Sequence, residues 1–574
     1  MKNKLIVFTL MMCLLIFACG KKGEEKKQEQ MTETKGDTGM IKDYEKIDVV
    51  KTQLAKLAPV EIGFDASMLD ENEQKVLMLL VRAAKYMDKI FLRQVYDKNI
   101  PIKQELDTAE NPDYTLLKKY FTVSFGPFDR LNAQKPFINL SEEKPLGANF
   151  YPEKMTKEEF EKWIKDHPDD EAAFTSNFTV ITKEGEALKA VPYSEAYKKF
   201  LEPAAKLLKE AAALTQNPSL KKFLNSRADA FASNDYYQSD MDWMDLKDHK
   251  IEIVIGPYEV YEDRLFGYKA AFEAFITLVD SEESKKLDVL AKHLVDMEKN
   301  LPIDDKYKTL DRGKSAPVMV VNEVFTAGDT KAGIQTTAFN LPNDERVRQA
   351  KGSKKVMLKN IARAKFEHCW IPIVKEVLSE TDMPFVSFDS YFNHVLMHEF
   401  SHGLGPGIIE KAGKKTTVNK ELKDLYSCLE EAKADIVGLW QLKFMIEKGV
   451  FPKELMKNIY STYLGGIFRS IRFGIDQAHG GGNAVAVNYI LEKGGFIFDE
   501  QTARFSVNKE KIEDAVKQLC HDILMIQAHG DYAAAKEMTD KYRKLTPPLQ
   551  KALENLSHVP VDIRPIYAIE KELK

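Results

Sequence analysis

The chain has 574 residues, of which 44% are hydrophobic and 30% are charged, and its net charge is −5. This composition is ordinary for a soluble globular protein, and about 150 residues per domain allow three or four units or two large lobes. The small negative charge, and the lack of a long basic run interleaved with aromatic residues, argue against a nucleic-acid partner.

The N-terminus has the features of a targeting segment. A basic start precedes Leu5–Ala18, an apolar run that is too short to span a bilayer. The small residue before Cys19 resembles the lipobox of bacterial lipoproteins, in which the equivalent cysteine becomes a lipidated N-terminus; an ordinary signal peptide is the alternative. We expect residues 1–18 to be a signal peptide and residues 19–45 to be a lipidated cysteine with a flexible charged tether. The protein would then be an extracytoplasmic, membrane-anchored lipoprotein on the periplasmic or cell-surface side.

The region from residue 46 to residue 285 mixes helical and strand patterns. Apolar residues recur at helical spacing from Asp70 to Tyr96, with Asp70 as the expected N-cap. Two further helices are expected on either side of Asn217 and Pro218. The segment Lys250–Gly256 changes to a period of two and predicts a strand. These patterns indicate a mainly mixed α/β lobe.

The pattern after residue 355 is almost entirely helical as far as about residue 545. A valine-rich strand, Ala316–Phe325, lies within residues 286–370, which we expect to cross between lobes and to carry substrate-binding segments. Residues 371–556 would form a helical catalytic lobe, followed by a C-terminal segment over 557–574. The three cysteines of this part give no disulfide framework and no CxxC zinc site, so buried unpaired thiols are expected at Cys369, Cys428 and Cys520.

Three histidines follow one another at intervals of four residues in "FNHVLMHEFSHGLGPG", so they share one face of a helix. His398 and His402 match the motif H-E-x-x-H, in which two imidazoles bind a metal and Glu399 takes a proton from the metal-bound water. His394 forms a competing pair with His398, but no glutamate follows it. We therefore interpret His394 as a packed or outer histidine. The glycines and proline of "GLGPG" end the helix.

A catalytic zinc needs a third protein ligand and an open fourth position. The best candidates lie in "SCLEEAKADIVGLW", on a helix expected from about Glu421 to Lys448. Glu430, Glu431 and Asp435 would be costly there if they were buried without partners. A solvated helix face is the alternative, and the sequence pattern alone does not choose among the three carboxylates.

Together these motifs resemble the dipeptidyl peptidase III family of zinc exopeptidases, which joins a zinc-binding H-E motif to a downstream E-E-x-R-A-E motif. The second motif is "EEAKAD" here. The resemblance implies that Glu431 is the third zinc ligand and that Glu430 orients a ligand histidine from the second shell, with Asp435 also in that shell. Lys433 and Asp435 replace the arginine and glutamate that are usual in the family, which keeps the charge but alters hydrogen-bond geometry.

Three more segments carry the resemblance. "GPYEVYEDRLFGYKAAFEAF" implies that Glu259 holds the free amine of the substrate and that Tyr261 contacts the scissile carbonyl. "NLPNDERVRQAKGSKKV" implies substrate binding by Asn340 and Asn343. "DQAHGGGNAVAVNYILEKGG" implies that His479 is catalytic. Without the resemblance, the simpler interpretation of Tyr261 is an aromatic residue at a strand end that packs on a core. The simpler interpretation of His479 is a loop histidine before a glycine-rich turn.

The chain also departs from the family pattern. Its zinc motif has five residues where many members have six, and Asn483 stands where an arginine is common. It resembles the peptidase-like half of plant homologues that are fused to a Nudix domain. No Nudix box is expected, because the required Arg-Glu dipeptide does not occur in the sequence, so diphosphate hydrolysis is not inferred.

The resemblance implies a predominantly helical, mixed α/β fold with a cleft between two lobes, one a helical zinc-binding lobe and the other a mixed lobe around a small β-barrel. It implies one Zn²⁺ per chain and release of dipeptides from the N-termini of short peptides, by Glu399-assisted attack of a zinc-bound water. Another zinc endopeptidase or dipeptidase activity, or a non-catalytic peptide- or metal-binding lipoprotein, is the alternative. Two histidines and a carboxylate also suit other transition metals.

Overall fold

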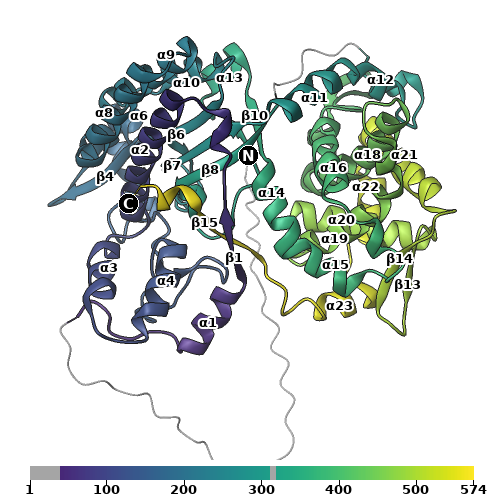
Figure 1. The fold of residues 1–574 in the computed structure, drawn as a ribbon, viewed down its shortest axis with the longest axis horizontal. Coiled ribbons are helices and arrows are strands. Elements are labelled where there is room, and N and C mark those ends of the chain that lie inside the picture. The colour runs from purple at the N-terminus through teal and green to yellow at the C-terminus, as the bar shows by residue number, and fades with distance from the viewer. Residues whose placement is uncertain (1–38, 311–317, 574) are drawn as a thin grey trace, which may run out of the picture.

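The computed structural model describes residues 39–310 and 318–573. The expected signal peptide, Cys19 and most of the expected tether lie outside these residues. Within them, no helix combines the length and the apolar character that a membrane span requires. The fold is mixed α/β with more helix than strand, and Figure 1 shows two lobes side by side, one mixed and one helical. The predicted fold class is therefore confirmed.

The mixed lobe contains a five-stranded sheet with the strand order β6-β7-β8-β10-β9. All its pairs are antiparallel except β8 with β10. The sheet is open, because β6 and β9 each have one neighbour among the described residues, so the expected small β-barrel is wrong. The strands are β6 (Ile251–Glu259), β7 (Ala271–Val279), β8 (Val318–Gly328), β9 (Ala338–Leu341) and β10 (Lys354–Leu358).

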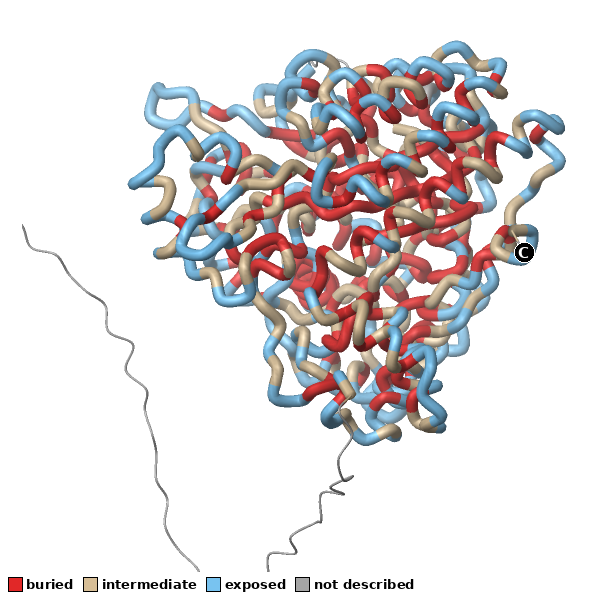
Figure 2. Tube along the Cα trace, turned by 90° about the vertical axis from the view of Figure 1, so that its left-hand side faces the viewer, coloured by how far each residue is buried: buried red, intermediate tan, exposed pale blue. Residues whose placement is uncertain are grey.

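Helix α2 (Glu71–Val95) is the central helix of this lobe and packs on β7 and β8. Its predicted N-cap is confirmed, since the Asp70 side chain accepts a hydrogen bond from the Glu73 amide and a capping box is complete. The predicted break before Pro218 separates α8 (Lys198–Leu214) from α9 (Pro218–Ser233). Buried residues run through the centre of the lobe (Figure 2). The remaining elements of the lobe are α1 (Ile47–Ala55), α3 (Asn99–Thr108), α4 (Tyr114–Ser124), α5 (Lys157–Asp166), α6 (Glu171–Phe174), α7 (Tyr193–Ala196), α10 (Tyr237–Met244), α13 (Glu345–Lys351), β2 (Phe128–Asp129), β3 (Lys135–Pro136), β4 (Thr179–Glu184) and β5 (Ala187–Pro192).

The helical lobe has its own hydrophobic core, in which α16 (Phe388–Ser401), α18 (Tyr426–Glu447), α20 (Ala478–Glu492) and α21 (Ile512–His529) are central. The helix expected from about Glu421 begins later, because Glu421 belongs to the separate short helix α17 (Val418–Leu422). The three cysteines are buried and unpaired, as predicted. The other elements are α11 (Ser281–Lys292), α12 (Leu294–Lys299), α15 (Ile371–Val377), α19 (Ile459–Ile471), α22 (Tyr532–Tyr542), α23 (Pro547–Glu554), β11 (Ile408–Lys411), β12 (Lys414–Thr417), β13 (Phe496–Asp499) and β14 (Arg504–Val507).

The chain passes between the lobes several times. Helices α11 and α12 pack in the helical lobe although they lie between strands of the mixed sheet. Helix α14 (Lys359–Lys365) then leads from β10 through a π-helical turn into α15. At the end of the chain β15 (Asp562–Tyr567) returns to the mixed lobe and pairs in parallel with β1 (Leu57–Ile62), as Figure 1 shows. The C-terminal segment is therefore a structural part of the first lobe.

The last residues of the expected tether are packed on the mixed lobe. Ile41 is buried, and Tyr44 forms a β-bridge with Ile138. The Met40 amide donates a hydrogen bond to the Glu105 carboxylate at 2.6 Å. The prediction of a flexible segment up to residue 45 is therefore wrong for residues 39–45, because their few apolar side chains find partners on the lobe.

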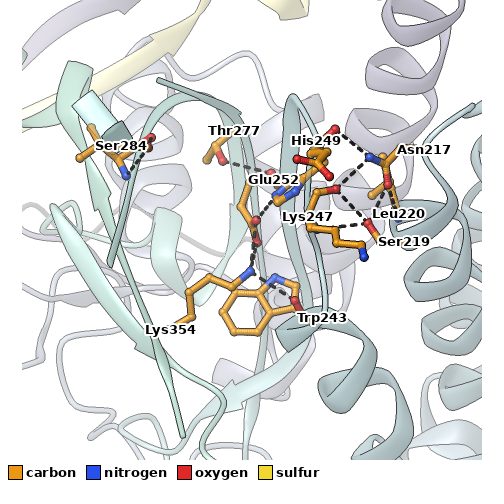
Figure 3. A network of polar contacts seen from close by, with 12 residues as sticks. Asn217, Ser219, Leu220, Trp243, Lys247, His249, Glu252, Thr277, Ser284 and Lys354 are labelled. Carbon is orange, nitrogen blue, oxygen red and sulfur yellow. Dashed lines mark hydrogen bonds and ion pairs between the residues drawn. The ribbon is translucent and has the colours of Figure 1, made fainter. Parts of the chain in front are cut away.

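A buried polar network joins β10 to β6 and to Trp243 (Figure 3). The predicted strand β6 is confirmed, and its Glu252 is buried. Lys354 of β10 lies 3.3 Å from the Glu252 carboxylate and donates a hydrogen bond to the Trp243 carbonyl at 3.2 Å. His249 contacts the same carboxylate at 2.5 Å. Burial alone would raise the pKa of Glu252, but Lys354 and His249 outweigh it and lower that pKa, so the carboxylate stays charged and paired.

Candidate metal centre

Two helices of the helical lobe bring three potential metal ligands together. His398 lies in the last turn of α16, and His402 follows directly after its last residue. The Nε2 atoms of the two imidazoles are 3.1 Å apart. Glu431 of α18 completes a group whose ligand atoms all lie within 4.8 Å of one another. His398, His402 and Glu431 are thus in one place and can hold one ion.

The surroundings of both imidazoles favour metal binding through Nε2. The Asp435 carboxylate lies 2.7 Å from Nδ1 of His398, and the Glu430 carboxylate lies 3.0 Å from Nδ1 of His402. Each carboxylate therefore accepts the Nδ1 proton and leaves the Nε2 lone pair directed at the other ring. Two nitrogen ligands of a tetrahedral zinc are roughly 3.3 Å apart. The observed separation and the set of two imidazoles and one carboxylate fit a zinc ion.

The charge of the site also favours a cation. Burial alone would lower the pKa of His398, but Asp435 and Glu431 outweigh it and raise that pKa to about 10. Burial would likewise raise the pKa of Glu431, yet His398 and His479 lower it, so this carboxylate is ionised at neutral pH. The group is therefore an anionic pocket that is suited to a proton or a metal ion.

His394 does not join this group. Its Nε2 atom donates a hydrogen bond to the backbone carbonyl of Asp435 at 2.9 Å, and its ring packs on Tyr463. Burial is the main cause of its lowered pKa, which keeps the imidazole neutral. A nitrogen that donates to a carbonyl has no lone pair for a metal, so the geometry agrees with an outer, packed histidine.

A further layer of polar residues supports the two carboxylates. Asn483 donates a hydrogen bond to Asp435 at 3.0 Å, and Gln527 donates one to Glu430 at 3.0 Å. Lys433 lies 2.8 Å from Glu430. Lys433 and Asn483, which stand where the resemblance leads one to expect arginines, thus contact the carboxylates that orient the two ligand histidines. The motif spacing indicated Asp435 and Glu430, but nothing in the sequence pattern pointed to Gln527.

Glu399 is placed beside the metal group and forms an ion pair across the cleft. Its partner is Lys355 of β10, on the mixed lobe. Lys355 follows Lys354, so the buried network of Figure 3 holds the strand that presents its ammonium group. We did not infer Lys355 from the sequence, because only the fold brings residues 355 and 399 together.

His479 lies in the first turn of helix α20 and not in a loop. The three glycines that follow it are buried helical residues, so the interpretation of a glycine-rich turn is wrong. A Cβ atom on Gly482 would lie 2.8 Å from the Ala432 amide of α18. The glycines therefore let α20 approach α18 closely, which places Nδ1 of His479 3.0 Å from the Glu431 carboxylate.

Gly438 has the same function between α16 and α18. A Cβ atom there would lie 2.9 Å from the His398 amide nitrogen, which is rigid backbone. We predict that Gly438→Ala separates the two helices, lowers stability by about 1–3 kcal/mol and weakens metal binding by roughly 10–100-fold. Urea unfolding and competition titration with a metal chelator would measure both effects. Gly407→Ala is the matched control, because a Cβ atom there meets no atom within 4 Å. Unchanged affinity in Gly438→Ala would contradict this account of helix spacing.

The metal group opens into a cavity of about 710 Å³ between the lobes. His398, Glu399 and His479 line it from the helical lobe, and Thr337 and Ala338 line it from the start of β9. The cavity thus lies between the metal group and an edge strand. This arrangement is suited to an extended chain that passes the metal with the strand beside it.

The remaining predicted site residues lie on the mixed lobe. Asn343 donates hydrogen bonds to the Glu259 carboxylate at 3.3 Å and to the Tyr258 carbonyl at 3.1 Å. Burial raises the pKa of Glu259. Asn340 is exposed on β9, and the Tyr261 side chain is 78% exposed. The structure thus brings Glu259 and Asn343 together but places neither them nor Tyr261 among the residues that line the metal cavity.

Comparisons with known proteins agree with this architecture. A family model described as peptidase family M49 matches residues 153–437. The chain is 42% identical over 578 residues to Nudix hydrolase 3 of Arabidopsis thaliana, which covers 91% of this chain and 74% of the plant protein. The structure of DPP III from Caldithrix abyssi matches with a TM-score of 0.88 and 58% identity, over 91% of this chain and all of the other. That of dipeptidyl-peptidase III from Corallococcus sp. strain EGB matches with a TM-score of 0.74 and 44% identity, over 92% and 99%. The chain therefore belongs to peptidase family M49, the dipeptidyl peptidase III family.

Proposed function

We propose that this peptidase releases dipeptides from the N-termini of short peptides and that it depends on one zinc ion. The observation that carries the proposal is the group of His398, His402 and Glu431 beside Glu399, in a cavity shared with an edge strand. Two solved relatives of similar fold are named as dipeptidyl-peptidase III, which supports the same activity here.

The three ligands would hold zinc, with Asp435 and Glu430 fixing the two imidazoles. Zinc supplies a Lewis acid that lowers the pKa of water and polarises a carbonyl. Glu399 takes the proton of the attacking water at its carboxylate oxygen. The ammonium group of Lys355 pairs with that carboxylate from the mixed lobe and orients it.

The donors for the developing negative charge come from both lobes. His479 would donate from the helical lobe, and the Tyr261 hydroxyl from the mixed lobe. Because Tyr261 is exposed and outside the cavity, its role requires the lobes to move together on the substrate.

The restriction to dipeptides needs a fixed point for the free α-amine. Glu259 provides a carboxylate for the ammonium group, while Asn343 orients that carboxylate and Asn340 contacts the peptide backbone. An endopeptidase needs no such anchor, and a strict dipeptidase would close the site beyond two residues.

Hydrolysis of Arg-Arg-arylamide tests the proposal directly. We expect release of arylamine that stops when the substrate amine is acetylated, with one zinc per chain by elemental analysis. Equal cleavage of the acetylated substrate would favour an endopeptidase. Bound zinc with no cleavage of either compound would refute dipeptide release from this substrate class.

We further propose that Cys19 carries a lipid anchor on the extracytoplasmic side of the membrane, on the basis of the sequence around it. Incorporation of labelled palmitate in the producing cell, and its loss in Cys19→Ser, would test this. Labelling that persists in Cys19→Ser would contradict it.

A further inference from the structure

Arg469 is a cation of the active-site cavity that has no use in the mechanism above. It lies in the last turn of α19 and lines the same cavity as His398 and Glu399. Its Nε atom is buried without a hydrogen-bond partner, and no ion pair joins its guanidinium group to any described residue. Its guanidinium carbon lies over the ring of Phe473, 5.8 Å from the ring centroid. A buried N–H group without a partner is costly, and an anion that enters the cavity would supply one.

The buried carboxylate of Asp562 pairs with a cation other than Arg469. Asp562 lies 3.0 Å from Lys365 and accepts a hydrogen bond from the Gln335 amide at 2.7 Å. Burial is the main cause of the lowered pKa of Lys365, and the charge of Arg469 lowers it further. Among the described residues no carboxylate therefore pairs with Arg469, and its charge lies in the same cavity as the residues that lead into β9.

The other end of β9 lies beside a carboxyl group. Asn343, two residues after β9, donates a hydrogen bond to the Glu259 carboxylate at 3.3 Å. Glu259 is suited to a cation there, while Arg469 is suited to an anion. A short peptide with free termini carries the matching charges at its two ends.

The register of the sheet gives the length of such a peptide. Glu399 contacts Lys355, which is paired with Asn340 in the middle of β9. Two residues of substrate would lie between the amine anchor and this point. From Asn340 through Ala338 to Thr337 the chain advances three residues, roughly 10 Å, which matches two or three further residues of an extended peptide.

We propose that Arg469 binds the C-terminal carboxylate of the substrate, so that the enzyme favours a peptide with a free C-terminus over the same peptide blocked there. The inference rests on the proposed dipeptide release. Arginine is suited to this role, because its planar guanidinium group binds a carboxylate through two parallel hydrogen bonds. Arg469 would thus determine specificity beyond the cleaved bond and take no part in the chemical step.

Tetra-alanine as the free acid and as the C-terminal amide would test the inference with the zinc-loaded enzyme. We expect kcat/KM for the acid to exceed that for the amide by roughly tenfold to a hundredfold, mainly through KM. In Arg469→Gln this acid-to-amide ratio should fall to near one. Arg469→Lys should give an intermediate ratio, because lysine keeps the charge but not the paired hydrogen bonds.

Arg363→Gln is the matched control. It removes the same charge, but Arg363 packs on Phe388 and does not line the cavity. The control should keep the wild-type ratio. Provided that Arg-Arg-arylamide is still cleaved, three results would overturn the inference. They are an acid-to-amide ratio near one in the wild type, an unchanged ratio in Arg469→Gln, and an equal loss of kcat/KM for acid and amide in that variant. Failure of the wild-type enzyme on every substrate would overturn the proposed function as well.

Discussion

Glu399→Ala is expected to leave the metal in place and to lower kcat by a factor of roughly a hundred to ten thousand. Among the described residues Glu399 makes no hydrogen bond to His398, His402 or Glu431, and its carboxylate is paired with Lys355 from the opposite lobe. Its removal therefore takes away the proton acceptor but none of the three ligand atoms. Steady-state kinetics with elemental analysis of the same sample would measure both quantities.

Glu399→Gln is the control for shape. It keeps the size of the side chain but cannot accept a proton as a carboxylate does, so its activity should be as low as that of Glu399→Ala. Substantial activity in Glu399→Gln, with metal bound, would show that another group accepts the proton and would refute the assignment.

Glu431→Ala is expected to lose both the metal and the activity. Glu431 supplies the carboxylate oxygen of the ligand group, and its loss leaves two imidazoles alone. The decrease in affinity should exceed the roughly 10–100-fold effect that is typical of residues outside the ligand sphere. Competition titration with a chelator would measure the affinity, and added zinc should restore little activity.

His394→Ala is the matched comparison for Glu431→Ala. His394 is on the same helix face as the two ligand histidines but donates to the Asp435 carbonyl. We expect His394→Ala to lower the affinity for the metal less than Glu431→Ala does. If His394→Ala emptied the site and His402→Ala did not, the assignment of the ligands would be wrong.

Local spacing predicted part of the site. It placed His398 and His402 one turn apart at the end of α16 and gave Glu430, Glu431 and Asp435 as candidates on a second helix, while the choice of Glu431 as third ligand came from the family resemblance. The capped helix α2 and the strand β6 follow from the same kind of local pattern. These predictions succeed because the contacts that define them are close in sequence.

Contacts between distant segments were not predictable in this way. Lys355 reaches Glu399 from another lobe, and Arg469 enters the cavity from a helix with no recognised motif. The glycines after His479 suggested a turn, because their use in helix packing depends on the position of α18. The barrel was expected from a resemblance, and the order of the strands shows an open sheet instead.

The pairing of β1 with β15 has a consequence for the synthesis of the chain. The ribosome makes β1 near the beginning of the protein and β15 at its end, and the entire helical lobe is made between them. Residues 366–559 can collapse on their own core as they emerge, since most of the residues in that core lie within this run. The lobe that is translated first is therefore completed last, and until release of the finished chain its edge at β1 needs protection from other strands in the cell.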